Sequence, residues 1–205
     1  MQNNNLKLKI KKFTLIYGAI ILISGIFYLV VTQSYPVAFV NWRPIAVKNF
    51  ETDYSSARVY YQKALETYDR NQAVVLDSME IQKELKRAVL DKLIENVLIE
   101  EELKKRLNND EIEKMVAGKI DEAIKGRDIK KEVEMLYGLS LEEFKERFLK
   151  PQAKSEIFAS RLLLENKNFD EELKKIKKEA KVMVFLAGFK WNGEEVIINP
   201  AVSPR

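Results

Sequence analysis

An uncharged stretch near the start of the chain limits what the remainder can fold into. The residues from Phe13 to Val31, FTLIYGAIILISGIFYLVV, include no charged side chain. As a helix they span about 28 Å, close to the hydrocarbon thickness of a bilayer. A core helix that is apolar on every face needs a protein shell around it, which the remaining chain is too small to supply easily. We therefore expect residues 13–32 to form a transmembrane anchor.

Charges on either side of this stretch predict its orientation. The basic residues that precede it are Lys7, Lys9, Lys11 and Lys12. The first basic residue after it is Arg43. By the positive-inside rule, residues 1–12 form a cytoplasmic tail, and the larger part of the chain lies outside the cytoplasm. We expect a single-pass protein of the cell membrane.

A cleavable signal peptide is the alternative to a retained anchor. Signal peptides have a shorter apolar region, which ends in a cleavage site of small residues. The stretch here is longer, and it is followed by Thr32-Gln33-Ser34-Tyr35-Pro36, a poor cleavage context. Retention of the anchor is favoured, and cleavage stays the open alternative.

The part after the anchor is formally neutral. The chain has 35 basic and 31 acidic residues, and the four lysines before the anchor account for the whole difference, since no acidic residue precedes Glu51. A neutral body has no basic surface to drive phosphate binding by counterion release, so we expect no nucleic-acid partner.

The absence of cysteine and histidine excludes most common catalytic sites. The chain contains no cysteine and no histidine, which excludes disulfides, zinc–cysteine sites and histidine acid–base chemistry. The sequence also lacks a recognisable nucleophile–base pair and a phosphate-binding glycine loop. We expect a protein that is not an enzyme, with no catalytic residue, no metal site and no cofactor.

The first half of the exported part reads as a short strand followed by helices. Residues 37–40 are β-prone, and the turn signal at 41–44 contains a proline. Apolar residues at helical spacing then predict three helices. They run from Val47 to about Asn71, from Leu76 to Leu107, and from Ile112 to about Gly126.

The second half carries sharper local signals. Gly138 should end a short helix over 132–137, and Ser140 with Glu143 forms a capping box that starts the next helix. Pro151 either kinks that helix or opens another that continues to about Glu165. A helix over 170–180, a strand over 182–186 and a hairpin at Asn192-Gly193 follow. The domain should span residues 37–199 around one core, with a frayed tail at 200–205.

Three segments resemble the N-terminal chaperone domain of the SurA family and its membrane-anchored relatives. They are Val40-Asn41-Trp42-Arg43-Pro44-Ile45, Val89 to Ile99, and Tyr137-Gly138-Leu139-Ser140-Leu141-Glu142-Glu143-Phe144. Together they lie within residues 37–165. Trp42 stands where the family usually has glycine, which puts the turn geometry there in question.

The resemblance implies a fold and an activity. The fold is mainly α, a multi-helix domain closed by a small β element in which the strand over 182–186 pairs with the strand over 37–40. The activity is binding of unfolded or exported polypeptides. Only four residues separate Glu165 from Asp170, where relatives insert a parvulin-type prolyl isomerase domain of about 100 residues, so that isomerase should be absent.

Aromatic residues are the candidate contacts for an unfolded polypeptide. They are Phe50, Tyr54, Tyr61, Tyr68, Phe144, Phe148 and Phe158. The alternative is that these side chains fill the core, as aromatic residues at helical spacing usually do. A structural or assembly subunit that docks one fixed membrane or envelope partner is the alternative function. No pattern in the sequence specifies an oligomeric state.

Overall fold

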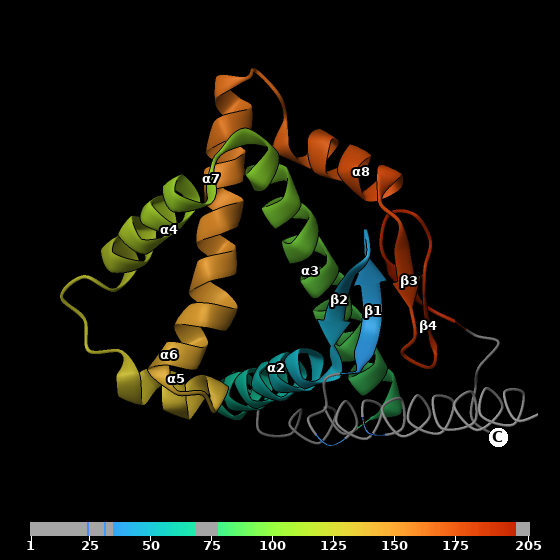
Figure 1. Cartoon of the computed structure of the whole chain (residues 1–205). Helices are drawn as coiled ribbons and strands as arrows, with labels where there is room; N and C mark the ends of the chain where they lie inside the picture. The colour runs from blue at the N-terminus through green and yellow to red at the C-terminus, as the bar shows by residue number, and fades with distance from the viewer. Residues whose placement is uncertain (1–23, 25–30, 32–34, 69–77, 200–205) are drawn as a thin grey trace, which may run out of the picture.

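The computed structural model describes residues 24, 31, 35–68 and 78–199. The expected tail at 1–12, nearly all of the anchor at 13–32, the helix end near Asn71 and the tail at 200–205 lie outside these residues. Within the part that is described, no helix combines the length and the apolar character needed to cross a membrane. That part is mainly helical, with small antiparallel sheets (Figure 1).

A three-stranded antiparallel sheet joins the two ends of the domain. Strand β1 (Pro36–Val40) lies between β2 (Arg43–Ala46) and β3 (Val182–Val184). Ala38, Phe39 and Val40 of β1 pair with Val184, Met183 and Val182 of β3. The predicted pairing of these distant segments is confirmed. Strand β2 was not predicted, because its proline suggested only a turn; on an edge strand, a proline can present its missing N–H to solvent.

The turn between β1 and β2 has an unusual backbone. Asn41 and Trp42 have φ values of 47° and 71°, and Val40 pairs directly with Arg43 across the turn. Positive φ at both central residues is typical of a type I′ turn, which favours asparagine and glycine. Asn41 donates to Glu101 Oε2 at 2.7 Å and accepts from the Lys181 N–H at 2.9 Å. Trp42 is 74% exposed, so its indole is not held by a core.

The helices follow the predicted order. They are α2 (Val47–Tyr68), α3 (Met79–Arg106), α4 (Asn109–Ile124), α5 (Lys130–Tyr137), α6 (Leu141–Phe144), α7 (Lys150–Leu164) and α8 (Phe169–Glu179). The capping box of Ser140 and Glu143 and the left-handed C-cap at Gly138 are both confirmed. A hairpin of β4 (Phe189–Trp191) and β5 (Val196–Ile198) forms the second sheet, as predicted around Asn192.

A π-helical turn, η2 (Lys145–Leu149), joins α6 to α7 without a gap. Pro151 lies in the first turn of α7 and has no N–H to donate to the carbonyl four residues earlier. The Lys150 N–H donates to the Lys145 carbonyl, the wider spacing of a π turn. The proline therefore opens α7 within one continuous helical rod.

Two hydrophobic cores lie along α3, so the expectation of one core is wrong. The first core contains the inner side of the three-stranded sheet, the start of α2 and Leu90, Ile94 and Leu98 of α3. The second core contains Ile99 and Leu103 of α3 with residues of α4, α7 and α8. The change of core between Leu98 and Ile99 is possible because neighbouring helix residues point about 100° apart.

Two acidic residues of α3 hold the C-terminal elements. Asp91 accepts from the Val196 N–H of β5 at 2.9 Å, and Lys177 of α8 lies 3.7 Å from Asp91 and 3.1 Å from Glu95. Neither carboxylate is therefore an ordinary exposed group. Lys177 and Val196 lie more than about eighty residues away in the chain, so no local pattern could reveal these contacts.

Replacing Trp42 with glycine should stabilise the fold. Glycine reaches φ near 71° without the steric cost of a side chain, so Trp42→Gly should raise the free energy of unfolding by about 1 kcal/mol. Urea unfolding of the full chain in detergent measures the change. Asn41→Gly is the matched control and should destabilise the fold, since it removes two hydrogen bonds. Equal effects of the two substitutions would contradict this account.

Removing the Asp91 carboxylate should loosen the C-terminal hairpin. Asp91→Ala leaves the part-buried Val196 N–H without its acceptor and should cost about 1.5–3 kcal/mol. Hydrogen exchange at Val196 and its β4 partner Trp191 should accelerate more than exchange in α4. The control is Asp121→Ala on the exposed side of α4, which should leave these rates unchanged.

Candidate functional site

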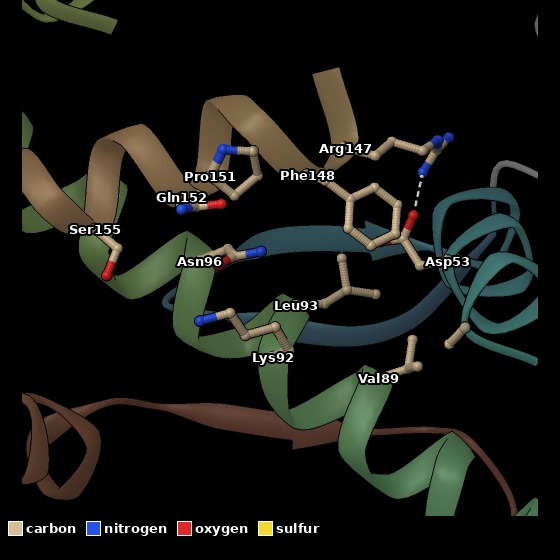
Figure 2. Close-up of a pocket in the computed structure, with 11 residues that line it drawn as sticks. Asp53, Val89, Lys92, Leu93, Asn96, Arg147, Phe148, Pro151, Gln152 and Ser155 are labelled. Atoms are coloured by element: carbon tan, nitrogen blue, oxygen red, sulfur yellow. Dashed lines mark hydrogen bonds and ion pairs between the residues drawn. The ribbon is translucent and has the colours of Figure 1, made fainter. Parts of the chain in front are cut away.

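A cleft of about 350 Å³ opens between α2, α3 and the η2–α7 junction. Figure 2 shows its side chains converging from these separate helices. Its lining is mixed, with apolar residues from every wall and polar groups between them. The lining residues are Asp53, Ala57, Val89, Lys92, Leu93, Asn96, Arg147, Phe148, Pro151, Gln152 and Ser155.

Each corner of the triangle formed by α2, α3 and α7 is held by a different contact (Figure 1). Phe50 of α2 and Leu90 of α3 belong to the first core. Lys154 of α7 donates to Glu100 of α3 at 2.7 Å. Arg147 of η2 bonds Asp53 of α2 at 2.9 Å. The cleft is the space left between these three helices.

Arg147 is the main polar connection between η2 and α2. Besides Asp53, it donates to the carbonyl and the side-chain oxygen of Asn49, at 3.4 and 3.3 Å. Burial raises the pKa of the Asp53 carboxyl, and the hydrogen bond and charge of Arg147 offset that rise only in part. Such a buried pair contributes little net stability. Its role is to set the position of the wall that carries Phe148.

Asn96 lines the cleft from α3, on the same wall as Val89 and Leu93. Its Oδ1 is buried and accepts no hydrogen bond from the residues that the structure describes. Because the surface of this oxygen is covered, a molecule in the cleft does not reach it.

An aromatic cluster continues the cleft onto the surface. We define it as Tyr60, Tyr61, Tyr137, Phe144 and Phe148. Tyr137 lies at its centre, with ring centroids 5.2 Å from Tyr60, 4.8 Å from Phe144 and 5.3 Å from Phe148. Tyr60 and Tyr61 are 40% and 49% exposed, and Phe148 also lines the cleft.

The predicted contact residues separate into two groups. Phe50 and Phe158 are fully buried in the first and second cores, and Tyr54 is buried and stacks on Phe50 with centroids 6.3 Å apart. These three do not line a groove, and for them the core interpretation holds. Tyr61, Phe144 and Phe148 come together in the aromatic cluster. The side chain of Tyr68 lies outside the described residues.

Sequence reasoning missed several residues of this region. Tyr60 and Tyr137 did not stand on the stripes that drew attention to the other aromatic residues. Asn96, Arg147 and Asp53 looked like ordinary polar positions of amphipathic helices. The one available signal was Pro151, because a proline after a capped helix start marks a place where the helix must deviate.

Glu100, Glu101 and Glu102 diverge, as their helical spacing predicts. Glu100 pairs with Arg43, Lys104 and Lys154, Glu101 accepts from Asn41, and Glu102 pairs with Lys105 and Arg106. The three carboxylates do not form a solvated face, since Glu102 is buried and Glu100 is half-buried. Over residues 35–68 and 78–199, no group of three or more acidic residues is placed to hold a metal ion.

Comparison of the chain with protein-family models, with curated proteins and with solved structures finds no match. The resemblance to the SurA N-terminal domain therefore stays a prediction, and it depends on the three segments between residues 37 and 165.

Glu100 should make the domain sensitive to acid. Burial alone would raise its pKa, but hydrogen bonds from Lys104, Lys154 and Arg43 outweigh burial and lower the pKa from 4.5 to about 2. A lowered pKa in the folded state gives stability that is complete above pH 4.5 and is lost as the pH falls towards 2. Glu100→Gln should therefore cost about 2–3 kcal/mol near neutral pH, and much less near pH 2.

Unfolding of the two proteins at several pH values measures this difference. Glu146→Gln is the control, because Glu146 pairs only with Lys150 at the surface and is 60% exposed. That substitution should change stability by less than about 0.5 kcal/mol at any pH. If the loss of unfolding free energy caused by Glu100→Gln is as large near pH 2 as near neutral pH, the lowered pKa of Glu100 is contradicted.

Proposed function

We propose that this chain is a membrane-anchored extracytoplasmic chaperone-like module. It binds unfolded or exported polypeptides through the cleft and the aromatic cluster, without catalytic turnover. The observation that supports this most is a cleft with apolar residues on every wall, one of which, Phe148, also belongs to the aromatic cluster that contains the exposed Tyr60 and Tyr61.

The chemistry of the cleft suits a short extended segment. An apolar side chain of the segment packs on Val89, Leu93 and Phe148. Such a contact needs no particular sequence beyond an apolar side chain. A volume of about 350 Å³ is at the small end of ligand sites, so one or two side chains fill it.

The aromatic cluster extends binding beyond the cleft. Tyrosine offers a flat apolar ring and a polar tip, and it makes contacts in a partly wet site at low entropic cost. Tyr60 and Tyr61 on α2 and Phe144 on α6 form a continuous surface with Phe148. Many weak contacts of this kind allow release without ATP.

Filling the cleft should abolish this activity while the fold stays intact. Ser155 lines the cleft from α7, so Ser155→Phe places a ring in the space that a polypeptide would occupy. The control is Ser160→Phe, on the same helix at an exposed position. Full-length protein in nanodiscs should slow the aggregation of an unfolded envelope protein, measured by light scattering at several-fold molar excess. Ser155→Phe should lose most of this effect, and Ser160→Phe should keep it.

Failure of the wild-type protein to slow aggregation, or equal activity of the two variants, would count against the proposal. A photo-crosslinking residue at position 155 in intact membranes then identifies what occupies the cleft. Many substoichiometric products support a chaperone. One stoichiometric product would instead identify the alternative, a structural or assembly subunit with a fixed partner.

A further inference from the structure

The outer face of the three-stranded sheet is apolar and exposed. Ala38, Val40, Val182 and Val184 contact the first core. Side chains alternate between the two faces of a strand, so Phe39 and Met183 point the other way, and they pair directly across β1 and β3. The outer sheet face consists of Phe39, Pro44, Met183 and Phe185, and the exposed Trp42 and Tyr35 lie beside it, in the β1–β2 turn and just before β1.

The exposure of this face is high for residues of these types. Trp42 is 74% exposed, Phe185 is 56% exposed and Met183 is 40% exposed. Phe185 continues the strand pairing through its N–H, which donates to the Val37 carbonyl at 2.8 Å, and its ring meets Phe39 edge to face at 5.8 Å. Phe39 and Phe185 therefore lie beside one another on this face.

Trp42 adds a second signal. A bulky residue at φ 71° strains the turn, and the indole gains no burial in return. Residues held at such a cost without a structural benefit are candidates for function. Tryptophan and tyrosine are the residues enriched where proteins meet the headgroup layer of a bilayer.

The charge around the face also suits a lipid surface. Strands β1, β2 and β3 contain no acidic residue. Arg43 pairs with Glu100 on the other side of the sheet, whereas the exposed Lys181 lies two residues before Met183 and is expected on the same face. A cationic residue beside an apolar face favours anionic headgroups.

The position of the face in the chain identifies which apolar partner is within reach. Only residues 33 and 34 separate Thr32, the end of the predicted anchor, from Tyr35. Even fully extended, this connection covers about 10 Å. If the anchor lies in the bilayer, the start of β1 must remain close to the headgroups.

We propose that the outer sheet face rests on the outer-leaflet headgroup layer, with Trp42 inserted among the headgroups. The proposal depends on the membrane anchoring that is part of the proposed function. The sheet packs on one side of α3 (Figure 1). The cleft is lined by Val89, Leu93 and Asn96 from another side of that helix. Docking through the sheet therefore leaves the cleft open to exported polypeptides.

The two tryptophans of the chain allow a direct test. Trp191→Phe leaves Trp42 as the only indole, and it removes a buried indole N–H that has no acceptor among the described residues. The full chain is reconstituted in phosphatidylcholine–phosphatidylglycerol vesicles with or without lipids brominated near the headgroup. Trp42 emission should fall about two-fold in the brominated vesicles, as expected for an indole at the interface.

The control places the only indole at an equally exposed site far from the sheet. It carries Trp42→Gly, Trp191→Phe and Leu164→Trp, since Leu164 is 76% exposed at the end of α7. Its emission should not change with brominated lipid. Equal quenching at both sites would overturn the proposal, because it would mean that the domain lies on the membrane without a preferred face.

Sedimentation with the vesicles separates the two proposals. If the protein sediments with the vesicles but Trp42 is not quenched, the docking proposal is overturned and the proposed anchored chaperone is not affected. A chain that stays in the supernatant overturns both the anchor and the docking. Trp42 emission that shifts to the blue with protein concentration, without quenching by brominated lipid, overturns docking by showing that a second copy covers the face.

Discussion

The burial of α3 in two cores is the interaction on which the rest of the structure depends. Leu98 ends the contribution of α3 to the first core, and Ile99 begins its contribution to the second. Each fully buried leucine or isoleucine contributes about 1.5–3 kcal/mol. The sheet and α2 pack against one part of α3, and α4, α7 and α8 pack against the other. The directions in which successive side chains of α3 point therefore set the relative placement of the two groups.

The cleft follows from that arrangement and from the local chemistry of Pro151. Because α2 joins α3 at the first core and α7 joins α3 at the second, the two helices diverge from α3 and meet each other only through η2. The π turn before Pro151 lies at that meeting point and carries both Arg147 and Phe148. One side chain fastens η2 to α2, and the other lines the space that remains. A site for an extended polypeptide thus arises without any specialised reactive group.

The two proposed surfaces make different kinds of contact. The cleft and the aromatic cluster offer weak apolar contact, which suits a changing set of polypeptides. The outer sheet face offers fixed aromatic side chains with a neighbouring cation, which suits a constant lipid surface. Both lie on elements that contact α3, so the sheet can fix the orientation of the cleft.

Local interactions explain what the sequence determined by itself. The capping box at Ser140, the left-handed Gly138, the hairpin at Asn192 and the order of the helices involve residues only a few positions apart, so their physics is visible in the pattern. Phe50, Phe158 and Phe148 all recur at helical spacing, and only the tertiary structure decided that the first two fill cores and the third lines a cleft. The partners of Asp91, the added strand β2, the left-handed Trp42 and the separation into two cores were likewise decided by tertiary structure. Each of these features depends on contacts between residues far apart in the sequence. Helical spacing shows which side chains share a face, but it does not show which part of the chain covers that face.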